Sequence, residues 1–418
     1  MRKRRENRAK AGNEAGFRFS LAGMIGLCIS VMLAGGLLTF GLFGRGIMSG
    51  QAGRSQPPSV SSSNNETPAW GNLLITEVEI EPPQEFIAKR IQSNRPPAWV
   101  FENMPEARKI MQASGLDAGL IERALSPVYC TSCPAATVVS PDESLLLSLS
   151  RDTRARFYRE LGRSASNYYM QFPFCFPAER IDQWFNAAKV DPELVALVKR
   201  LLYRRGSVEC FSDLEFIMRQ AVSEDQRLAL RKALARQPAL LARLQVGTGT
   251  DLDRILDYWG RSLQVREARP LLESIKREPQ GGNISLAYLL PRFARDRLYT
   301  FPSPPQANEP VRDCQWSTMN FFNDTPDDRF ADPAYTTRYL AAHYFQVAEP
   351  GCYGDIVLIL DDRGTAIHSA VYLAEGIVFT KNGGDYAQPW TLMRLKDLVA
   401  GYHGEEPGRI LIYRNKQS

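Results

Sequence analysis

The chain has 418 residues, of which 44% are hydrophobic and 23% are charged. These fractions are typical of soluble globular proteins and exclude wholesale disorder, a collagen-like repeat and a polytopic membrane protein. Residues 1–18 hold seven basic and two acidic side chains and so carry the whole net charge of +5. The rest of the chain is neutral overall and has no basic field to attract nucleic acid, so we exclude nucleic acid as a partner.

Residues 19–43 form a stretch of 25 residues without a charge. A helix of this length crosses the roughly 30 Å hydrocarbon core of a bilayer, and it is longer than the apolar core of a signal peptide, about 7–15 residues. Basic residues precede it, so we expect residues 1–18 to be a cytoplasmic tail and everything after the anchor to be extracytoplasmic, periplasmic or at the cell surface. Cleavage at the small-residue triplet Gly50-Gln51-Ala52 is the alternative to a single-pass membrane protein.

Residues 44–72 are rich in Ser, Pro, Asn and Gln and are expected to form a flexible linker. Partial alternation in residues 73–80 predicts a short strand. From about residue 105 to 297 the hydrophobic period is helical, including a helix that starts at Ser223 and runs to Leu244 with an interruption at Pro238. We therefore predict a mainly helical domain over residues 73–300, whose role could be to bind an envelope protein partner.

Six cysteines follow the predicted anchor and would meet an oxidising compartment. Cys130-Thr131-Ser132-Cys133 resembles a redox CxxC, but the flanking residues do not predict the strand-then-helix context that such a site needs. A four-thiolate zinc site with Cys175 and Cys210 would lack a second CxxC pair. We expect structural disulfides among these four cysteines, in one of three pairings.

Beyond residue 300 the pattern changes to two helices followed by strands. The helices are expected at 314–322 and about 334–347, and the strands at 354–361, 365–373, 377–381, 389–395 and 409–413, with a turn at Glu375-Gly376. On the strand 365–373, alternation predicts His368, Ala370 and Tyr372 on one face. The order of elements predicts an α+β fold overall, with a separate C-terminal domain over residues 301–418.

A cysteine and a histidine in this segment could form a nucleophilic pair. Cys314 follows Asp313, a good helix N-cap, and the helix dipole should lower the pKa of a thiol in the first turn. Of the three histidines, His343 lies in a predicted helix as a packing residue and His403 in an exposed loop, which leaves His368 as the base. A third polar group should hold the imidazole from Thr380, Lys381 or Asn382.

These fragments resemble the NlpC-type cell-wall cysteine peptidases, a branch of the papain-like fold. Asp313-Cys314-Gln315-Trp316-Ser317 is similar to their Asp-Cys-Ser-Gly opening, and Gly354-Asp355-Ile356-Val357 to their Gly-Asp-Leu-Val strand start. His368-Ser369-Ala370-Val371-Tyr372-Leu373 is similar to their His-Val-Gly-Ile-Tyr-Leu. The resemblance covers about residues 310–414. Gln315-Trp316 replaces the usual Ser-Gly, which indicates a bulkier groove beside the cysteine.

The resemblance implies that Cys314 is the nucleophile and His368 the base, with the third position at Lys381 or Asn382. Asn382 is preferred because an amide oxygen can accept from imidazole and lysine cannot. It also implies a membrane-anchored hydrolase that cleaves amide bonds in peptidoglycan stem peptides without a metal or organic cofactor. The alternatives are a catalytically inactive envelope scaffold with the same fold, an acyltransferase using the same triad, and a Cys314–Cys352 disulfide in place of the catalytic thiol.

Overall fold

The computed structural model describes residues 67–90, 96–133, 136–186, 189–206, 208–260, 267–304, 309–361, 364–403 and 409–417; of residues 88–90, Cys133 and His403 it describes the backbone alone. The predicted tail, anchor and most of the linker therefore lie outside the described residues. Within the described ranges, no helix has both the length and the apolar character needed to cross a bilayer.

The chain combines helices with antiparallel sheets, which confirms the mixed α+β class. One sheet has six strands, in the order β10-β15-β11-β12-β13-β14, and three smaller sheets have three strands each. The strand pairs within the sheets are antiparallel throughout the described residues.

A first hydrophobic core lies between Trp99 and Leu234 and is surrounded mainly by short helices. The helices are α3 (Met104–Ala113), α4 (Ala118–Ala124), α5 (Glu143–Ser148), α6 (Arg151–Leu161), α7 (Tyr168–Gln171), α8 (Ile181–Asn186), α9 (Pro192–Leu201), α10 (Leu214–Gln220) and α11 (Glu224–Ala235). Helix α2 (Gln84–Arg90) precedes them and contacts α11.

Two small sheets interrupt this helical region, which the sequence pattern did not predict. One has the strand order β2 (Trp99–Phe101), β4 (Ala136–Val139), β3 (Cys130–Cys133), and the other β5 (Phe174–Pro177), β7 (Val208–Phe211), β6 (Tyr203–Arg205). The strands have three or four residues each, too short for a period-two pattern to stand out from the sequence. The CxxC cysteines Cys130 and Cys133 lie at the two ends of β3, in extended backbone.

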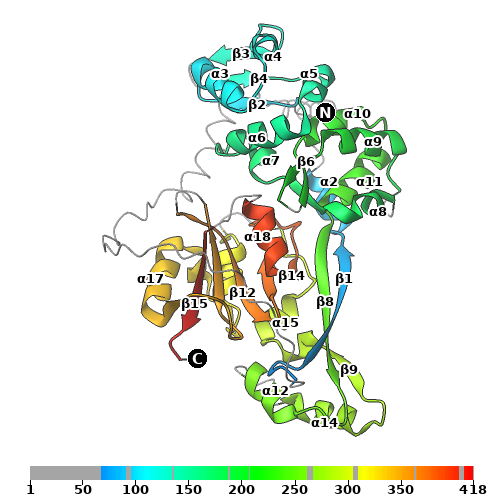
Figure 1. Cartoon of the computed structure of the whole chain (residues 1–418), viewed down its shortest axis with the longest axis vertical. Coiled ribbons are helices and arrows are strands. Elements are labelled where there is room, and N and C mark those ends of the chain that lie inside the picture. Colours follow the sequence, from blue (N-terminus) through cyan, green and yellow to red (C-terminus); the bar gives the residue numbers. More distant parts are fainter. Residues whose placement is uncertain are drawn as a thin grey trace, which may run out of the picture. The chain divides into compact units, whose positions relative to one another are not determined.

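Strand β8 (Gln237–Val246) corrects the prediction of a helix through Leu244. It pairs along its whole length with β1 (Asn72–Ile80), the strand predicted at 73–80, and Figure 1 shows the two running side by side. Pro238 cannot continue a helix. Beyond Leu240 the buried residues Ala242, Leu244 and Val246 alternate with more exposed ones, which is the period of a strand.

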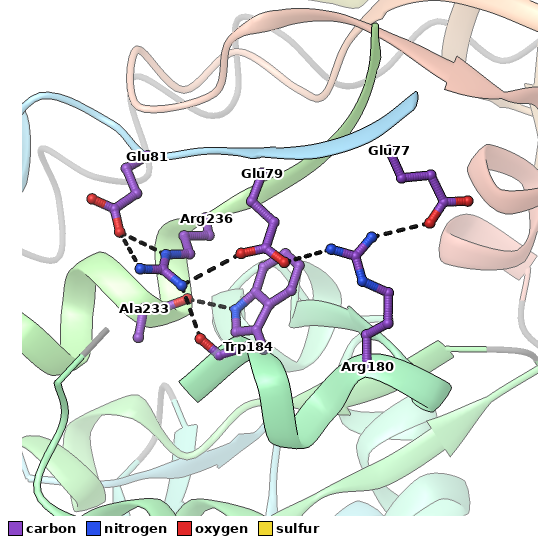
Figure 2. Close-up of polar contacts among 7 residues, drawn as sticks. All are labelled: Glu77, Glu79, Glu81, Arg180, Trp184, Ala233 and Arg236. Carbon is purple, nitrogen blue, oxygen red and sulfur yellow. Dashed lines mark hydrogen bonds and ion pairs between the residues drawn. The ribbon is translucent and has the colours of Figure 1, made fainter. Parts of the chain in front are cut away.

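Two arginines attach β1 to the helical region through the β1 glutamate cluster, which we define as Glu77, Glu79, Glu81, Arg180 and Arg236. The glutamates are two residues apart and share one face of the chain, and Figure 2 shows both guanidinium groups reaching them. Arg180 contacts Glu77 at 3.0 Å and Glu79 at 2.6 Å. The Arg236 side chain, only 7% exposed, pairs with Glu79 and Glu81. It also donates to the Trp184 carbonyl at 2.9 Å.

A second hydrophobic core joins β8 to the C-terminal sheet. Its buried residues run from Leu240 to Leu392 and come from β8, β9 (Gly282–Ser285), α12 (Leu252–Trp259), α14 (Arg269–Arg277), α15 (Arg292–Arg297) and the sheet. The Tyr258 hydroxyl donates to the Leu373 carbonyl at 2.6 Å, and the Tyr299 hydroxyl to the Leu240 carbonyl at 2.5 Å. Residues 240–298 thus share a core with the segment after residue 301, where we predict a domain boundary.

The C-terminal elements follow the predicted order with three differences. They are α16 (Cys314–Met319), α17 (Pro333–His343), β10 (Tyr344–Val347), β11 (Ile356–Leu360), β12 (Ala366–Ala374), β13 (Ile377–Lys381), β14 (Trp390–Arg394), α18 (Leu395–His403) and β15 (Arg409–Asn415). The first predicted helix ends three residues early. The second ends at His343, and the last four residues form β10. Helix α18 was not predicted.

Strand β12 is buried on both faces from His368 onward, and its two faces belong to different clusters. Val371 and Leu373 belong to the core that contains α16, whereas Ala370 and Tyr372 belong to a smaller cluster with Leu398 of α18. The predicted alternation of the strand is therefore confirmed. The predicted turn after it is also present, because Glu375 and Gly376 both have positive φ (51° and 71°), as in a type I′ hairpin.

Replacing Arg236 should test how much the β1 glutamate cluster contributes to stability. Arg236→Ala removes one of the two arginine partners of the half-buried Glu79, the partner of the exposed Glu81 and a donor to the Trp184 carbonyl, so we expect the free energy of unfolding to fall by about 1–3 kcal/mol. Urea unfolding of the full chain measures this. Arg292→Ala, which removes an exposed ion pair with Asp296 on α15, is the matched control and should change stability by less than ~0.5 kcal/mol. Equal effects of the two substitutions would contradict a structural role for the cluster.

Candidate active site

Cys314 is the first residue of α16, as predicted. Asp313 caps the helix, accepting from the backbone N–H of Trp316 at 2.9 Å. Asp313 is itself largely buried, and this burial raises the pKa of its carboxyl group. The helix is only six residues long, so its dipole is weak compared with the charges and burial around the thiol.

The Cys314 thiol is held in its neutral form, contrary to the thiolate that the helix dipole predicts. Burial and the neighbouring Asp313 carboxylate raise the pKa of Cys314 to about 11. Hydrogen bonds from the backbone N–H and the hydroxyl of Ser369, and the charge of Lys381, act in the opposite direction and are outweighed. Cys314 is partly accessible to solvent and has a free thiol.

His368 lies near the start of β12 and is 2% exposed. Its ring stacks on Tyr402 of α18, with ring centroids 4.4 Å apart and an interplanar angle of 19°. Burial, together with the charge of Lys381, lowers the pKa of His368 to about 3. The imidazole is therefore a neutral base over the physiological pH range.

The two ring nitrogens of His368 differ in their partners. Nε2 lies 2.7 Å from the hydroxyl oxygen of Thr380 on β13. Nδ1 is buried, and no group of the described residues makes a hydrogen bond with it. When Nε2 donates to Thr380, Nδ1 is the unprotonated nitrogen of the neutral ring and is able to take a proton.

The side chain that bonds to the imidazole is therefore Thr380 and not Asn382, the residue that was preferred for this contact. The Asn382 amide donates to the sulfur of Met393 at 3.4 Å, and its oxygen has no hydrogen-bond partner within the described part of the chain. Val371 lies opposite Phe379 in the pairing of β12 with β13. If this register is continued, Asn382 lies directly opposite His368, and Thr380 is its diagonal neighbour. A long side chain reaches a diagonal neighbour, so the ring bonds to Thr380, which the residue types alone did not indicate.

Lys381, the other predicted third residue, has a different place. It is fully buried, and its ammonium group donates to the carbonyls of Gly383 (2.6 Å) and Asp385 (3.0 Å). Its charge lowers the pKa of Cys314 and of His368. Lys381 therefore provides a positive charge near both groups and is not the residue that bonds to the imidazole ring.

The structure brings the Cys314 sulfur to the backbone beside His368. The Ser369 N–H that bonds to the thiol belongs to the peptide group joining His368 to Ser369. The Ser369 hydroxyl also lies 3.1 Å from the Thr318 hydroxyl of α16, so Ser369 faces α16, whereas His368 faces α18. Across the described residues no direct hydrogen bond between the thiol and the imidazole is present.

The Gly-Asp start of β11 is held by charge and does not form the alternative disulfide. Asp355 is fully buried and accepts from Arg414 at 2.9 and 2.7 Å. Although burial opposes this, the hydrogen bonds from Arg414 and from the backbone N–H of Gly351 and Cys352 lower the pKa of Asp355. Cys314 and Cys352 are both free thiols.

The other two histidines do not join the site. His343 ends α17 and is exposed, and its ring packs against that of Tyr339 with centroids 4.3 Å apart. His403 is the last residue of α18 and not part of a loop. In the described part of the chain no group of three His, Cys, Asp or Glu side chains is placed to hold a metal ion.

Two residues around the site were missed from the sequence: Ser369 and Tyr402. Thr380 was named as one of three candidates but was not the preferred one. Tyr402 could not be identified because α18 itself was not predicted.

An open depression of about 350 Å³ lies elsewhere, lined by residues that include Glu81, Lys232 and Arg236.

Comparisons of the chain with protein-family models, with curated proteins and with solved structures gave no match.

The low pKa of His368 predicts a specific acid sensitivity. A histidine whose pKa falls from 6.5 unfolded to about 3 folded stabilises the fold above pH 6.5, and this contribution is lost as the pH falls toward 3. It should lower the free energy of unfolding by about 2 kcal/mol between pH 7 and pH 5.

His368→Asn should remove this decline, whereas His343→Asn, at an exposed site, should retain it. Urea unfolding at the two pH values measures the difference, and comparison with the variant cancels contributions from other groups. The same pH dependence in wild type and His368→Asn would show that the ring is not held neutral by the fold.

Proposed function

We propose that the C-terminal segment is a papain-like, NlpC-type catalytic domain and that the protein is a membrane-anchored cysteine hydrolase of the cell envelope. Its substrates would be amide bonds, with peptidoglycan stem peptides as the class that the sequence resemblance implies. Cys314 is the proposed nucleophile, His368 the base and Thr380 the group that orients the base. No metal or organic cofactor is required.

The observation that carries this proposal is the bond between His368 Nε2 and Thr380 Oγ1 at 2.7 Å. It fixes the ring through one nitrogen and leaves Nδ1 for proton transfer, as a general base requires. The proposed triad has the order cysteine at a helix start, histidine on a strand and polar group on the next strand. Cys314 contacts Ser369, the residue next to His368. Strand β12 therefore carries the proposed base and also contacts the proposed nucleophile.

In the proposed reaction a rearrangement of the site first brings His368 Nδ1, which faces α18 at rest, within reach of the Cys314 thiol on the α16 side of β12. The Cys314 proton then passes to Nδ1 as the sulfur attacks the substrate carbonyl carbon. The imidazolium then protonates the leaving amine, and the C–N bond breaks to leave a thioester. Water, deprotonated at Nδ1, attacks the thioester, and the acid product leaves as the proton returns to the sulfur. Because the resting groups are a neutral thiol and a neutral imidazole, the positive charge of Lys381 would stabilise the thiolate as it forms.

The remaining parts of the chain have proposed roles that follow from their order. Residues 19–43 would hold the protein in the membrane with its bulk on the extracytoplasmic side. The helical region would present substrate, cover the groove or bind an envelope protein partner. The aromatic contact between Phe86 of α2 and Tyr386, with ring centroids 5.3 Å apart, supports a role close to the catalytic segment.

A catalytically inactive scaffold is the second candidate, and two observations favour it. Cys314 lies on the α16 side of β12 and the His368 ring on the α18 side, without a hydrogen bond between them among the described residues. A thiol with a pKa of about 11 is less than one part in a thousand ionised at neutral pH, which suits a structural cysteine. An acyltransferase using the same residues differs only in whether an amine or water resolves the thioester.

Purified full chain should release new amino groups from isolated peptidoglycan, and Cys314→Ala should reduce this release to background because the nucleophile is absent. Cys352→Ala, at another free and partly exposed cysteine, is the matched control and should retain activity. Products of an added amine would identify the acyltransferase. Equal release by wild type and Cys314→Ala, or no release by either with both folded, would rule out the hydrolase in favour of the scaffold.

Thr380→Val should separate orientation of the base from packing. It removes the hydroxyl that holds Nε2 and should lower kcat about tenfold, corresponding to about 1.4 kcal/mol for one hydrogen bond. Thr391→Val is the control, since Thr391 is directly opposite Thr380 on β14 and is also buried. An unchanged kcat in Thr380→Val would contradict the proposed role.

A further inference from the structure

Two cysteines outside the candidate active site lie directly opposite each other. Cys175 on β5 and Cys210 on β7 are register partners in the antiparallel β5-β7-β6 sheet. Their sulfur atoms are 3.6 Å apart. Cys175 is partly accessible, whereas Cys210 is fully buried.

The backbone at this position suits a covalent link. Directly opposite residues in an antiparallel pair have Cα atoms about 4.5 or 5.5 Å apart, and both separations fall within the 4.4–6.8 Å range of disulfides. A disulfide bond is about 2.05 Å long, so the sulfurs need to approach by about 1.5 Å. Small changes of χ1 in the two side chains achieve this without moving the strands.

The two thiols differ in reactivity in the way that a redox pair requires. The hydrogen bond from Cys210 and the nearby charge of Arg205 lower the pKa of Cys175, against the effect of burial. Burial, above all, raises the pKa of Cys210. Arg205 is held in place by its own bond to the Met170 carbonyl at 2.6 Å. Cys175 is thus the accessible, more acidic thiol, and Cys210 is the buried one behind it.

We propose that Cys175 and Cys210 form a reversible disulfide by exchange with a small-molecule or protein disulfide, with Cys175 reacting first. The Cys175 thiolate attacks one sulfur of the incoming disulfide, forming a mixed disulfide and releasing one thiolate. Cys210 loses its proton and attacks the Cys175 sulfur, which closes the protein disulfide and releases the second thiolate. The protein pair gives up two electrons and two protons, and the incoming disulfide becomes two thiols.

This bond would lie beside the helix that covers the candidate active site. Helix α18 contacts both β6 and β7. The charges of Cys314 and of Cys175 both add to the effect of burial in raising the pKa of Tyr402, the residue of α18 that stacks on His368. A closed disulfide would tie β5 to β7 next to this helix. The β5-β7-β6 sheet contacts α18, and Tyr402 of α18 stacks on His368, so a continuous set of contacts runs from the cysteine pair to the proposed base.

Peptide mapping of the full chain tests the pair without any assay of hydrolysis. The chain is equilibrated with oxidised or reduced glutathione, free thiols are alkylated, and tryptic peptides are separated without reduction. Oxidised protein should contain peptide 164–180 linked to peptide 206–219, 2 Da lighter than the sum of the reduced peptides. Reduced glutathione should abolish the linked peptide. Alkylation of both cysteines in the oxidised sample, or linkage of Cys175 to a different cysteine, would overturn the proposal.

Single substitutions test the order of attack. In Cys210→Ser, Cys175 should accumulate as a stable mixed disulfide with glutathione because no thiol resolves it. In Cys175→Ser, the buried Cys210 should stay unmodified in the folded protein. Modification of Cys210 but not of Cys175 would reverse the assigned order. Cys352→Ser is the matched control and should leave the 164–180 and 206–219 linkage intact. If a variant does not fold, the wild-type map alone still decides whether the bond forms.

Discussion

From His368 onward strand β12 is buried on both faces, so its polar side chains there must find their partners inside the protein. His368 faces α18 and bonds to Thr380, and Ser369 faces α16 and bonds to Thr318. The candidate site follows from this constraint, because the consecutive residues His368 and Ser369 pack against different helices, α18 and α16. The proposed nucleophile contacts β12 from the α16 side, whereas the proposed base projects from β12 toward α18. Burial affects the protonation states of both groups more than neighbouring charges do.

Much of the C-terminal fold could be predicted from the sequence. The strand at 377–381 was predicted with its observed bounds, and Asp313 was identified as the cap of the helix that begins at Cys314. These features have local causes: residue alternation, a capping side chain and a turn with positive φ at Glu375-Gly376. Helix α18 and strand β8 were missed. Leucine-rich runs fit both periods when they are short, and Pro238 only marks where a helix cannot continue.

The sequence narrowed the hydrogen-bond partner of His368 to three consecutive residues but did not identify which of them bonds to the ring. Asn382, Lys381 and Thr380 follow one another, and the choice among them depends on the register of β13 against β12, which no single segment reveals. The pKa of Cys314 was predicted in the wrong direction for a similar reason. A helix start favours thiolate locally, but burial and the Asp313 carboxylate depend on how the helix packs and are larger.

The position of β8 has a practical consequence for dissecting the protein. This strand follows Arg236 directly, pairs with β1, and supplies Leu240, Ala242 and Leu244 to the core that contains Trp316 and Trp390. A recombinant fragment beginning at residue 301 would lack the strand and expose the apolar side chains that it covers. Fragments for crystallisation or limited proteolysis are therefore better begun before β1 than at the apparent end of the helical region.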